Sequence, residues 1–95
     1  MFRKSAQPKQ QVTNGRFEIE EEGRTAFLEY NLAGNVLQLI HTEVPPELQG
    51  KGVGIELAKS ALDWARESGT KVDVVCELVA AYIKRHPEYA DLVLR

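Results

Sequence analysis

The sequence predicts one α/β domain with a mixed sheet: an antiparallel three-strand meander, a glycine-rich loop, a helix, a parallel strand and a second helix. A change in the spacing of apolar residues carries this prediction. Between residues 16 and 32 apolar and polar residues alternate, as in strands, and after the Pro45-Pro46 pair apolar residues recur at helical spacing. The chain of 95 residues is long enough for one small hydrophobic core.

Three strands are predicted before the proline pair. Residues 16–23 and 24–32 each alternate apolar with polar side chains, and the short connection at Gly23 makes them an antiparallel hairpin. Residues 36–44 carry apolar side chains on both faces. We therefore expect this third strand to lie centrally in the sheet, covered on both sides.

The second half of the chain predicts helix, strand and helix. The first helix is indicated by apolar residues at three- and four-residue spacing: Leu57, Ala58, Ala61, Leu62 and Ala65. Gly69 is expected to end it. Residues 71–75 form a short strand that follows a helix and should therefore run parallel to the third strand. The second helix should cover residues 77–85 and end before Pro87.

Composition limits the domain organisation and the partners. Residues 1–13 are polar and are interpreted as a flexible N-terminal arm, and residues 14–95 as the folded domain. The net charge of -2 gives no reason to expect a nucleic acid or a membrane surface as partner. No apolar run suggests a signal peptide or a membrane span. A single cysteine cannot form an internal disulfide, which favours a reducing, cytoplasmic location.

Three glycines, Gly50, Gly52 and Gly54, stand where the first helix should begin, although glycine is a poor helix former. A strand, a glycine-rich turn and a helix form an anion site, because the first helical turn has unpaired N–H groups that glycines leave accessible. The sequence lacks G-x-x-x-x-G-K-[ST], and Ile55 breaks G-x-G-x-x-G. The alternative is a plain turn and helix cap, but three glycines in five positions exceed that need.

The pattern Q-x-x-G-x-G, written here Gln49-Gly50-Lys51-Gly52-Val53-Gly54, resembles the pyrophosphate-binding segment of the GCN5-related N-acetyltransferases. The resemblance continues through HTEVP, the first helix, VVC and AAYIKRHPEY, and is to the small single-domain branch of that superfamily. It implies that acetyl-CoA or CoA binds as a substrate and that no metal takes part. The residues it assigns to cofactor binding are Thr42, Val44, Gln49, Gly50, Lys51, Gly52, Val53, Gly54, Ile55 and Cys76.

The same resemblance suggests catalytic residues. The Val44 N–H would donate to the thioester carbonyl, an oxyanion-hole role. Glu43 and His41 share a face of the third strand and are candidates to take a proton from the amine, the alternative being that they only order the loop. Tyr82 matches a tyrosine that protonates the leaving thiolate in the family, the alternative being aromatic packing.

Cys76 follows the strand at residues 71–75 and stands six residues before Tyr82, where many family members carry an asparagine. It is either a small buried residue or a reactive thiol at a helix N-terminus that lines the cleft or is acylated. The small branch commonly has proline next, whereas this chain has Glu77, whose charge disfavours a thiolate beside it.

The resemblance implies an acetyl-CoA-dependent N-acetyltransferase acting on a primary amine, either a protein lysine or a small amine. The alternative is a CoA- or acyl-CoA-binding module with little or no transferase activity. Larger family members have an N-terminal strand and helices that wall the acceptor site, whereas here only a short arm is expected. The acceptor side should therefore be open and suited to a protein acceptor, or completed by a protein partner. A purely structural domain would leave the three glycines unexplained.

Overall fold

A computed structural model describes residues 2–4 and 13–94. From residue 13 onward the order of the strands and α-helices confirms the predicted one, and a short strand at Phe2–Lys4 is additional. The strands are β1 (Phe2–Lys4), β2 (Thr13–Glu21), β3 (Arg24–Ala33), β4 (Val36–Glu43) and β5 (Lys71–Val74), and the helices are α1 (Val53–Ser68) and α2 (Glu77–Arg85), with 3₁₀ helices at Pro46–Leu48 and Pro87–Leu92.

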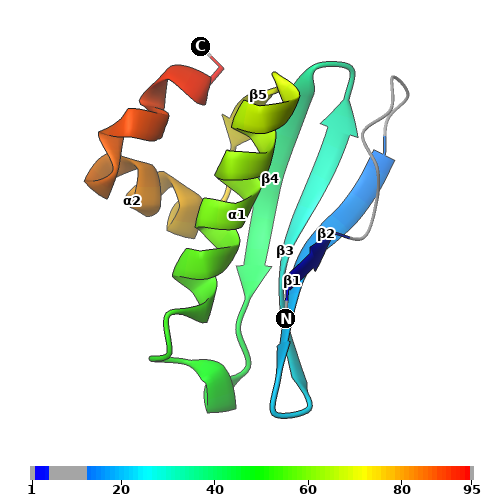
Figure 1. Cartoon of the computed structure of the whole chain (residues 1–95), viewed down its shortest axis with the longest axis vertical. Helices are drawn as coiled ribbons and strands as arrows, with labels where there is room; N and C mark the ends of the chain where they lie inside the picture. The colour runs from blue at the N-terminus through cyan, green and yellow to red at the C-terminus, as the bar shows by residue number, and fades with distance from the viewer. Residues whose placement is uncertain (1, 5–12, 95) are drawn as a thin grey trace.

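The strands form one mixed sheet in the order β1-β2-β3-β4-β5 (Figure 1). β1 to β4 pair antiparallel in succession, and β4 pairs parallel with β5. The predicted meander followed by a parallel strand is therefore confirmed. α1 supplies the connection between the two parallel strands, which cannot be joined by a tight turn.

The N-terminal segment differs from the predicted arm at Phe2–Lys4. These residues form β1 and pair with Phe17, Glu18 and Ile19 of β2. The edge of β2 offers unpaired N–H and C=O groups, which a further strand satisfies. Residues 5–12 of the predicted arm lie outside the described residues.

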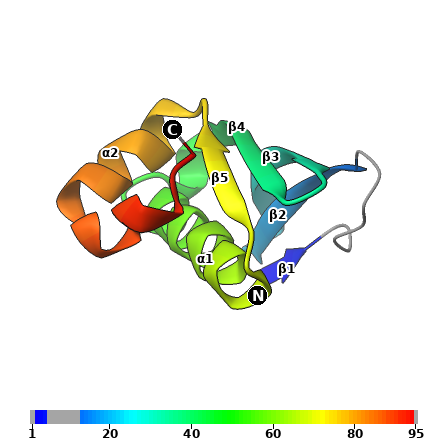
Figure 2. The ribbon, with the colours of Figure 1, turned by 90° about the horizontal axis from the view of Figure 1, so that it is seen from above.

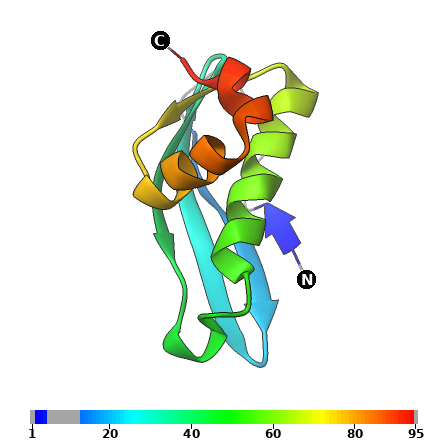
Figure 3. The same ribbon diagram turned by 90° about the vertical axis from the view of Figure 1, so that its left-hand side faces the viewer.

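Both helices cover the same face of the sheet (Figures 2 and 3). Leu37 and Leu39 of β4 are completely buried on this face. On the opposite face Gln38 accepts a hydrogen bond from Asn31 and donates one to Asp73, each 3.2 Å long. The expectation that this strand is covered on both sides is therefore wrong, because a row of polar side chains crosses its second face.

The ends of α1 and α2 follow from local chemistry. Gly69 adopts the left-handed conformation, with φ at 72°, and its N–H bonds to the carbonyls of Ala65 and Arg66, which confirms the predicted helix end. Pro87 opens a 3₁₀ helix that the sequence did not indicate. Within it, buried Tyr89 donates a 2.6 Å hydrogen bond to Asp63 of α1 and so fixes the C-terminal segment against the core.

The core lies between the helices and the covered face of the sheet. Its completely buried large side chains are Phe17, Leu28, Leu32, Leu37, Leu39, Leu48, Leu57, Leu62, Val72 and Val79. Burial of this apolar surface stabilises the fold by about 25 cal/mol per Å² removed from water. Among the described residues, no helix is long and apolar enough to cross a membrane.

Candidate active site at the separation of β4 and β5

A β-bulge in β4 sets the direction of the site residues. Leu39 pairs with Tyr30 and His41 with Glu29, so Ile40 is an extra residue on β4. The bulge shifts the alternation of side chains along the strand. His41, Thr42 and Glu43 lie opposite Glu29, Leu28 and Phe27. Because paired residues share a face, Thr42 points toward the helices, as buried Leu28 does, and His41 and Glu43 point to the open face.

The two parallel strands separate just beyond this point. Pairing ends at Leu39 and Val74, and the N–H groups of Val75 and Cys76 both bond to the Leu39 carbonyl at 2.9 Å. β4 then continues to Glu43, while the other chain segment turns into α2. The hollow between them, here called the strand gap, has a volume of about 360 Å³ and is lined by Ile40, His41, Thr42, Val75, Cys76, Glu77 and Leu78.

Thr42 and Cys76 meet inside the strand gap. The Thr42 Oγ1 atom lies 3.2 Å from the Cys76 Sγ atom, within hydrogen-bonding distance. Cys76 is the N-cap residue of α2 and is only 6% exposed. The thiol is thus buried, as expected of a small packing residue, and it also lines a hollow, as expected of a reactive thiol. The exposed Glu77 follows it in the first helical turn.

The three glycines of the loop are there for two different structural reasons. Gly50 and Gly52 have φ values of 82° and 79°, a left-handed conformation that side chains rarely adopt. Gly54 leaves space for Leu78, because a Cβ atom on it would lie 2.9 Å from Cδ1 of Leu78 and 3.6 Å from Cγ2 of Val44, so the Leu78 side chain would have to move. The helix therefore begins close against β4 and α2.

The N-terminus of α1 has donors with no acceptor in the helix. Gly52 is the N-cap residue and provides no side-chain cap, and the first bond of the helix runs from the Glu56 N–H to the Gly52 carbonyl at 3.0 Å. The N–H groups of Val53, Gly54 and Ile55 therefore have no intrahelical partner. With the helix dipole they form a partially positive site suited to an anion.

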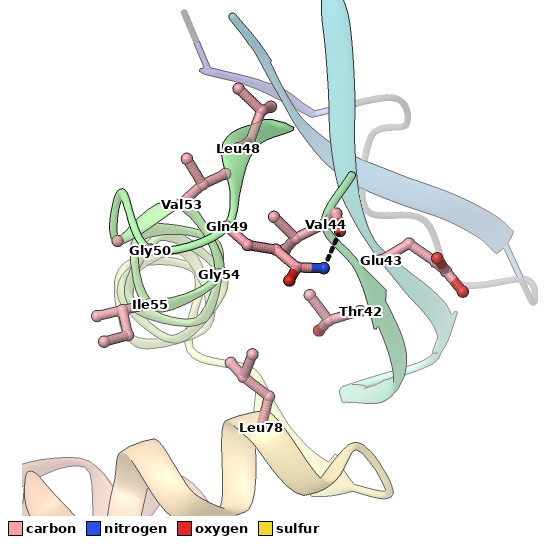
Figure 4. A pocket seen from close by; sticks show the side chains of 11 residues that line it. Thr42, Glu43, Val44, Leu48, Gln49, Gly50, Val53, Gly54, Ile55 and Leu78 are labelled. Atoms are coloured by element: carbon pink, nitrogen blue, oxygen red, sulfur yellow. Dashed lines mark hydrogen bonds between the residues drawn. The ribbon is translucent and has the colours of Figure 1, made fainter. Parts of the chain in front are cut away.

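These donors stand at a cleft of about 760 Å³, here called the main cleft (Figure 4). Its lining comes from β4, the glycine loop, α1 and α2: Thr42, Glu43, Val44, Leu48, Gln49, Gly50, Gly52, Val53, Gly54, Ile55 and Leu78. Thr42 and Leu78 also line the strand gap. The two hollows are therefore adjacent parts of one site, which contains or borders most of the predicted cofactor residues.

Gln49 and Lys51, two of the predicted cofactor residues, make contacts that position the loop. Gln49 Nε2 donates a 3.0 Å hydrogen bond to the Val44 carbonyl, which joins the end of β4 to the glycine loop (Figure 4). Lys51 Nζ lies 2.7 Å from Glu22 Oε2 at the tip of the β2–β3 hairpin. The Lys51 side chain is thus directed to the hairpin, and Lys51 does not line the main cleft.

His41 and Glu43 form a pair on the open face. His41 Nε2 and Glu43 Oε2 are 2.8 Å apart, and the two side chains are 55% and 60% exposed. The sequence placed them correctly on one face. His41 also lines the strand gap, opposite Cys76. The imidazole of His41 thus stands at the outer mouth of the gap, with Thr42 on its inner side. The carboxylate of Glu43 lines the main cleft instead.

Tyr82 is separate from this group. It is buried, stacks on His86 with ring centroids 4.2 Å apart, and lines a groove of about 210 Å³ between α1 and α2. This hollow, here called the helix groove, is lined by Ile55, Leu78, Ala81, Tyr82, Arg85 and His86. Tyr82 is one helical turn beyond Leu78, and Cys76 does not line the groove. Its assignment as general acid stays a prediction.

Leu78 is the site residue that the sequence analysis missed. Its side chain lines the main cleft, the strand gap and the helix groove. The available signal was its spacing, since Leu78 and Tyr82 are four residues apart on the same helical face. No group of His, Cys, Asp or Glu able to hold a metal ion is found among residues 2–4 and 13–94.

A family model described as GCN5-related N-acetyl-transferase matches residues 16–92. The chain belongs to this family. The matched span contains the bulge, the glycine loop, the strand gap and both helices, so the expected family is confirmed for almost the whole described domain. Members of this family use acetyl-CoA. The fold is accordingly a minimal version of the family fold.

Curated relatives give the same relationship. The protein NATD1 of Gallus gallus is 38% identical over 63 residues, which are 65% of this chain and 57% of the relative. The human protein NATD1 is also 38% identical over 63 residues, 56% of its length. The protein NATD1 of Danio rerio is 33% identical over 72 residues, covering 73% of this chain and 66% of the relative. The matches to the chicken and human proteins thus cover little more than half their lengths.

Proposed function

We propose that this protein is an acetyl-CoA-dependent N-acetyltransferase that acts on a primary amine. The observation that carries the proposal is the continuity between the unpaired N–H groups of α1 and the strand gap. The anion site and the gap between the two strands lie in adjacent hollows that share Thr42 and Leu78. A thioester attached through a long arm to a diphosphate needs both parts.

The diphosphate would lie on the N–H groups of Val53, Gly54 and Ile55. Because Gly54 has no Cβ, α1 begins close to Leu78 and Val44, and these three residues line the main cleft. The pantetheine arm would follow the edge of β4 that β5 leaves unpaired, with its thioester end toward Thr42 and Cys76. We keep Val44 as the donor to the thioester carbonyl, because Val44 lines the main cleft at the end of β4 and Gln49 holds the chain there through the Val44 carbonyl.

Proton transfer falls to His41 and Glu43 in this proposal. The amine nitrogen bonds to the acetyl carbon and the carbon–sulfur bond breaks. The proton that the nitrogen then loses, passed directly or through water, goes to the departing thiolate, which leaves as CoA. A primary ammonium must first lose a proton, and His41, which lines the strand gap and contacts Glu43 at 2.8 Å, is placed to accept it. Cys76 lines the path of the arm beside Thr42 and needs no covalent step.

The acceptor is proposed to approach from the open face of the sheet. The side chains of His41 and Glu43 are more than half exposed on this face. This geometry suits the side chain of a protein lysine, or a smaller amine held by a protein partner that completes the site. Binding both reactants across one strand would supply much of the acceleration through proximity.

A second function, a CoA-binding module with little transferase activity, is favoured by that same exposure. A base in open solvent is not shielded from water, and Tyr82 lies in a neighbouring groove. The arrangement holds the arm of CoA better than it encloses the reacting atoms. The two functions share the main cleft and differ only in what happens at the outer mouth of the gap.

One experiment distinguishes the N-acetyltransferase from the CoA-binding module. Titration calorimetry would measure the affinity for CoA, and mass spectrometry would follow the mass of lysine peptides and of polyamines incubated with protein and acetyl-CoA. The His41→Gln/Glu43→Gln double variant is the control, because it should bind CoA normally and transfer acetyl more slowly. We expect binding and an acetylated amine. Binding without any acetylated product would support the module instead, and absence of CoA binding would contradict both functions.

A further inference from the structure

A hollow on the open face of the sheet adjoins the strand gap, and the proposed function does not use it. This hollow, here called the open-face hollow, has a volume of about 360 Å³, and its lining includes Arg16 of β2, Glu29 and Asn31 of β3, and Ile40 of β4. Ile40 also lines the strand gap. The residue that forms the bulge in β4 therefore stands between the gap and a second hollow over β2 and β3.

Glu29 provides the carboxylate of the open-face hollow. Its side chain is half-buried and lies directly opposite Arg16 on β2 and His41 on β4. Within residues 2–4 and 13–94, however, the Glu29 carboxylate forms no hydrogen bond or ion pair. A charge that is partly withdrawn from water and has no partner is costly, and a bound cation would relieve that cost.

Glu29 differs in this respect from other carboxylates on the same face. Three of these have a contact with a neighbouring side chain, in the pairs Arg16–Glu18, Gln38–Asp73 and His41–Glu43. Those contacts satisfy their carboxylates within the protein. The Glu29 carboxylate remains available to a ligand.

The neighbours of Glu29 leave the hollow suited to an ammonium group. The guanidinium of Arg16 is engaged elsewhere, since it lies 3.9 Å above the Phe27 ring and 3.6 Å from Glu18. Asn31 donates its Nδ2 to Gln38 at 3.2 Å, which leaves its Oδ1 as an acceptor. A carboxylate and an amide oxygen together match a group that carries only donors.

The open-face hollow lies at a defined distance from the proposed reaction. Glu29 is the cross-strand partner of His41, and the side chains of such pairs begin about 5 Å apart. The strand gap is on the β5 side of β4, and Glu29 is on β3. An amine in the gap and a cation at Glu29 would thus be one to two strand spacings apart, about 5–10 Å. An alkyl chain of about four to six carbon atoms spans this distance.

We infer that the open-face hollow binds a second ammonium group of the acceptor, which makes the acceptor an aliphatic diamine or polyamine. Glu29 is the residue that determines this specificity, and it takes no part in proton transfer. The inference rests on the proposed N-acetyltransferase function and names the substrate class for it. An acceptor with a single amino group leaves Glu29 without a partner and therefore binds more weakly.

The test compares cadaverine with pentylamine as acceptors, because the two differ only in the second amino group. Release of CoA gives kcat and KM, and mass spectrometry identifies the acetylated product. We expect wild-type protein to have a KM at least about tenfold lower for cadaverine, since hydrogen bonds between ionised groups are among the stronger ones. Glu29→Gln should remove most of the difference between the amines by raising the KM for cadaverine, and Glu29→Asp should restore part of it.

Glu20→Gln is the matched control. Glu20 is an exposed carboxylate of β2 that does not line the open-face hollow, so this variant removes the same charge without changing the proposed site. It should keep the preference for cadaverine. Equal losses in Glu29→Gln and Glu20→Gln would show a general effect of charge and overturn the inference.

The remaining outcomes separate the inference from the proposed function. Equal KM values of wild-type protein for the two amines would overturn the inference and leave the proposed function intact. So would acetylation of lysine peptides with no product from cadaverine. Absence of an acetylated product from every amine and peptide would instead contradict the proposed function on which the inference rests.

Discussion

The hydroxyl of Thr42 and the thiol of Cys76 lie 3.2 Å apart, at the point where β4 and β5 separate. Residues 34 positions apart in the sequence thus form the inner end of the strand gap. Thr42 reaches this position because the bulge at Ile40 turns it toward the helices. Cys76 reaches it as the residue that caps α2.

This contact predicts a thiol that CoA protects. In the native protein Cys76 should react with a small reagent such as methyl methanethiosulfonate, because the strand gap gives access to the sulfur atom. Saturating CoA should slow the reaction at least about tenfold, since the bound arm would fill the gap. Cys76 is the only cysteine in the chain, so mass spectrometry reports it directly. A thiol that reacts only in denaturant, or at the same rate with CoA present, would contradict the placement of the arm.

Gly54 and Leu78 should be coupled in CoA binding. Gly54→Ala places a methyl group 2.9 Å from Leu78 Cδ1 and should push this side chain into the cleft. We expect CoA affinity to fall about tenfold or more while the protein stays folded, because alanine favours the helix. Adding Leu78→Ala should restore part of the affinity. Calorimetry on both single variants and the double variant checks this, and strictly additive losses would show that the two residues act independently.

The exposed His41–Glu43 pair predicts modest catalytic effects. With an acceptor identified, His41→Gln and Glu43→Gln should each lower kcat less than about tenfold, below the usual range for general acid–base groups, because water can also take the proton. Tyr82→Phe should leave kcat nearly unchanged, since Tyr82 lies in the helix groove. Rates measured against pH for the three variants would decide. A large loss in Tyr82→Phe, with unchanged CoA affinity, would return the general acid to α2.

The Tyr89–Asp63 hydrogen bond predicts how stability depends on pH. This bond is the main cause that raises the pKa of Tyr89 to about 12. Burial would raise the pKa of Asp63, but hydrogen bonds from Lys59 and Tyr89 outweigh it and lower that pKa. The raised pKa of Tyr89 means stabilisation that is present below about pH 10 and lost as the pH rises toward 12. The lowered pKa of Asp63 means stabilisation that is lost as the pH falls below about 4.

Tyr89→Phe should therefore lower the free energy of unfolding by about 1 kcal/mol near neutral pH, as for an ordinary hydrogen bond. The difference from wild type should shrink at both pH extremes. Urea unfolding at several pH values checks this. Tyr82→Phe is the control, because its hydroxyl donates to no residue that the structure describes. Equal losses in the two variants would mean that the Asp63 bond contributes nothing particular.

The glycine loop could be predicted from the sequence, whereas the direction of the side chains on β4 could not. Three glycines in five positions are unusual at the start of a helix, so Gly50, Gly52 and Gly54 indicate the loop directly. The bulge at Ile40 has no such signature, because apolar residues on both faces of β4 fit a strand with or without an extra residue. Without the bulge, the direction of Thr42 cannot be deduced.

Tertiary contacts account for the other features of the structure that the sequence did not indicate. Tyr82 matches the family tyrosine by its distance from Cys76 along the chain, but helical geometry carries it beyond Leu78 into another hollow. The polar second face of β4 depends on Gln38, whose partners Asn31 and Asp73 come from two other strands. β1 depends on pairing with the free edge of β2, which no local pattern in the sequence indicates.

The central claim is that the free N–H groups at the start of α1 hold the diphosphate of CoA. Amide NMR during titration with CoA tests it most directly, with pantetheine, which has no diphosphate, as the comparison. We predict that CoA shifts the amide signals of Val53, Gly54 and Ile55 most strongly, and that pantetheine leaves these three signals in place. CoA shifts confined to the open face around Asn31 and Gln38, with the α1 amides unmoved, would contradict the claim.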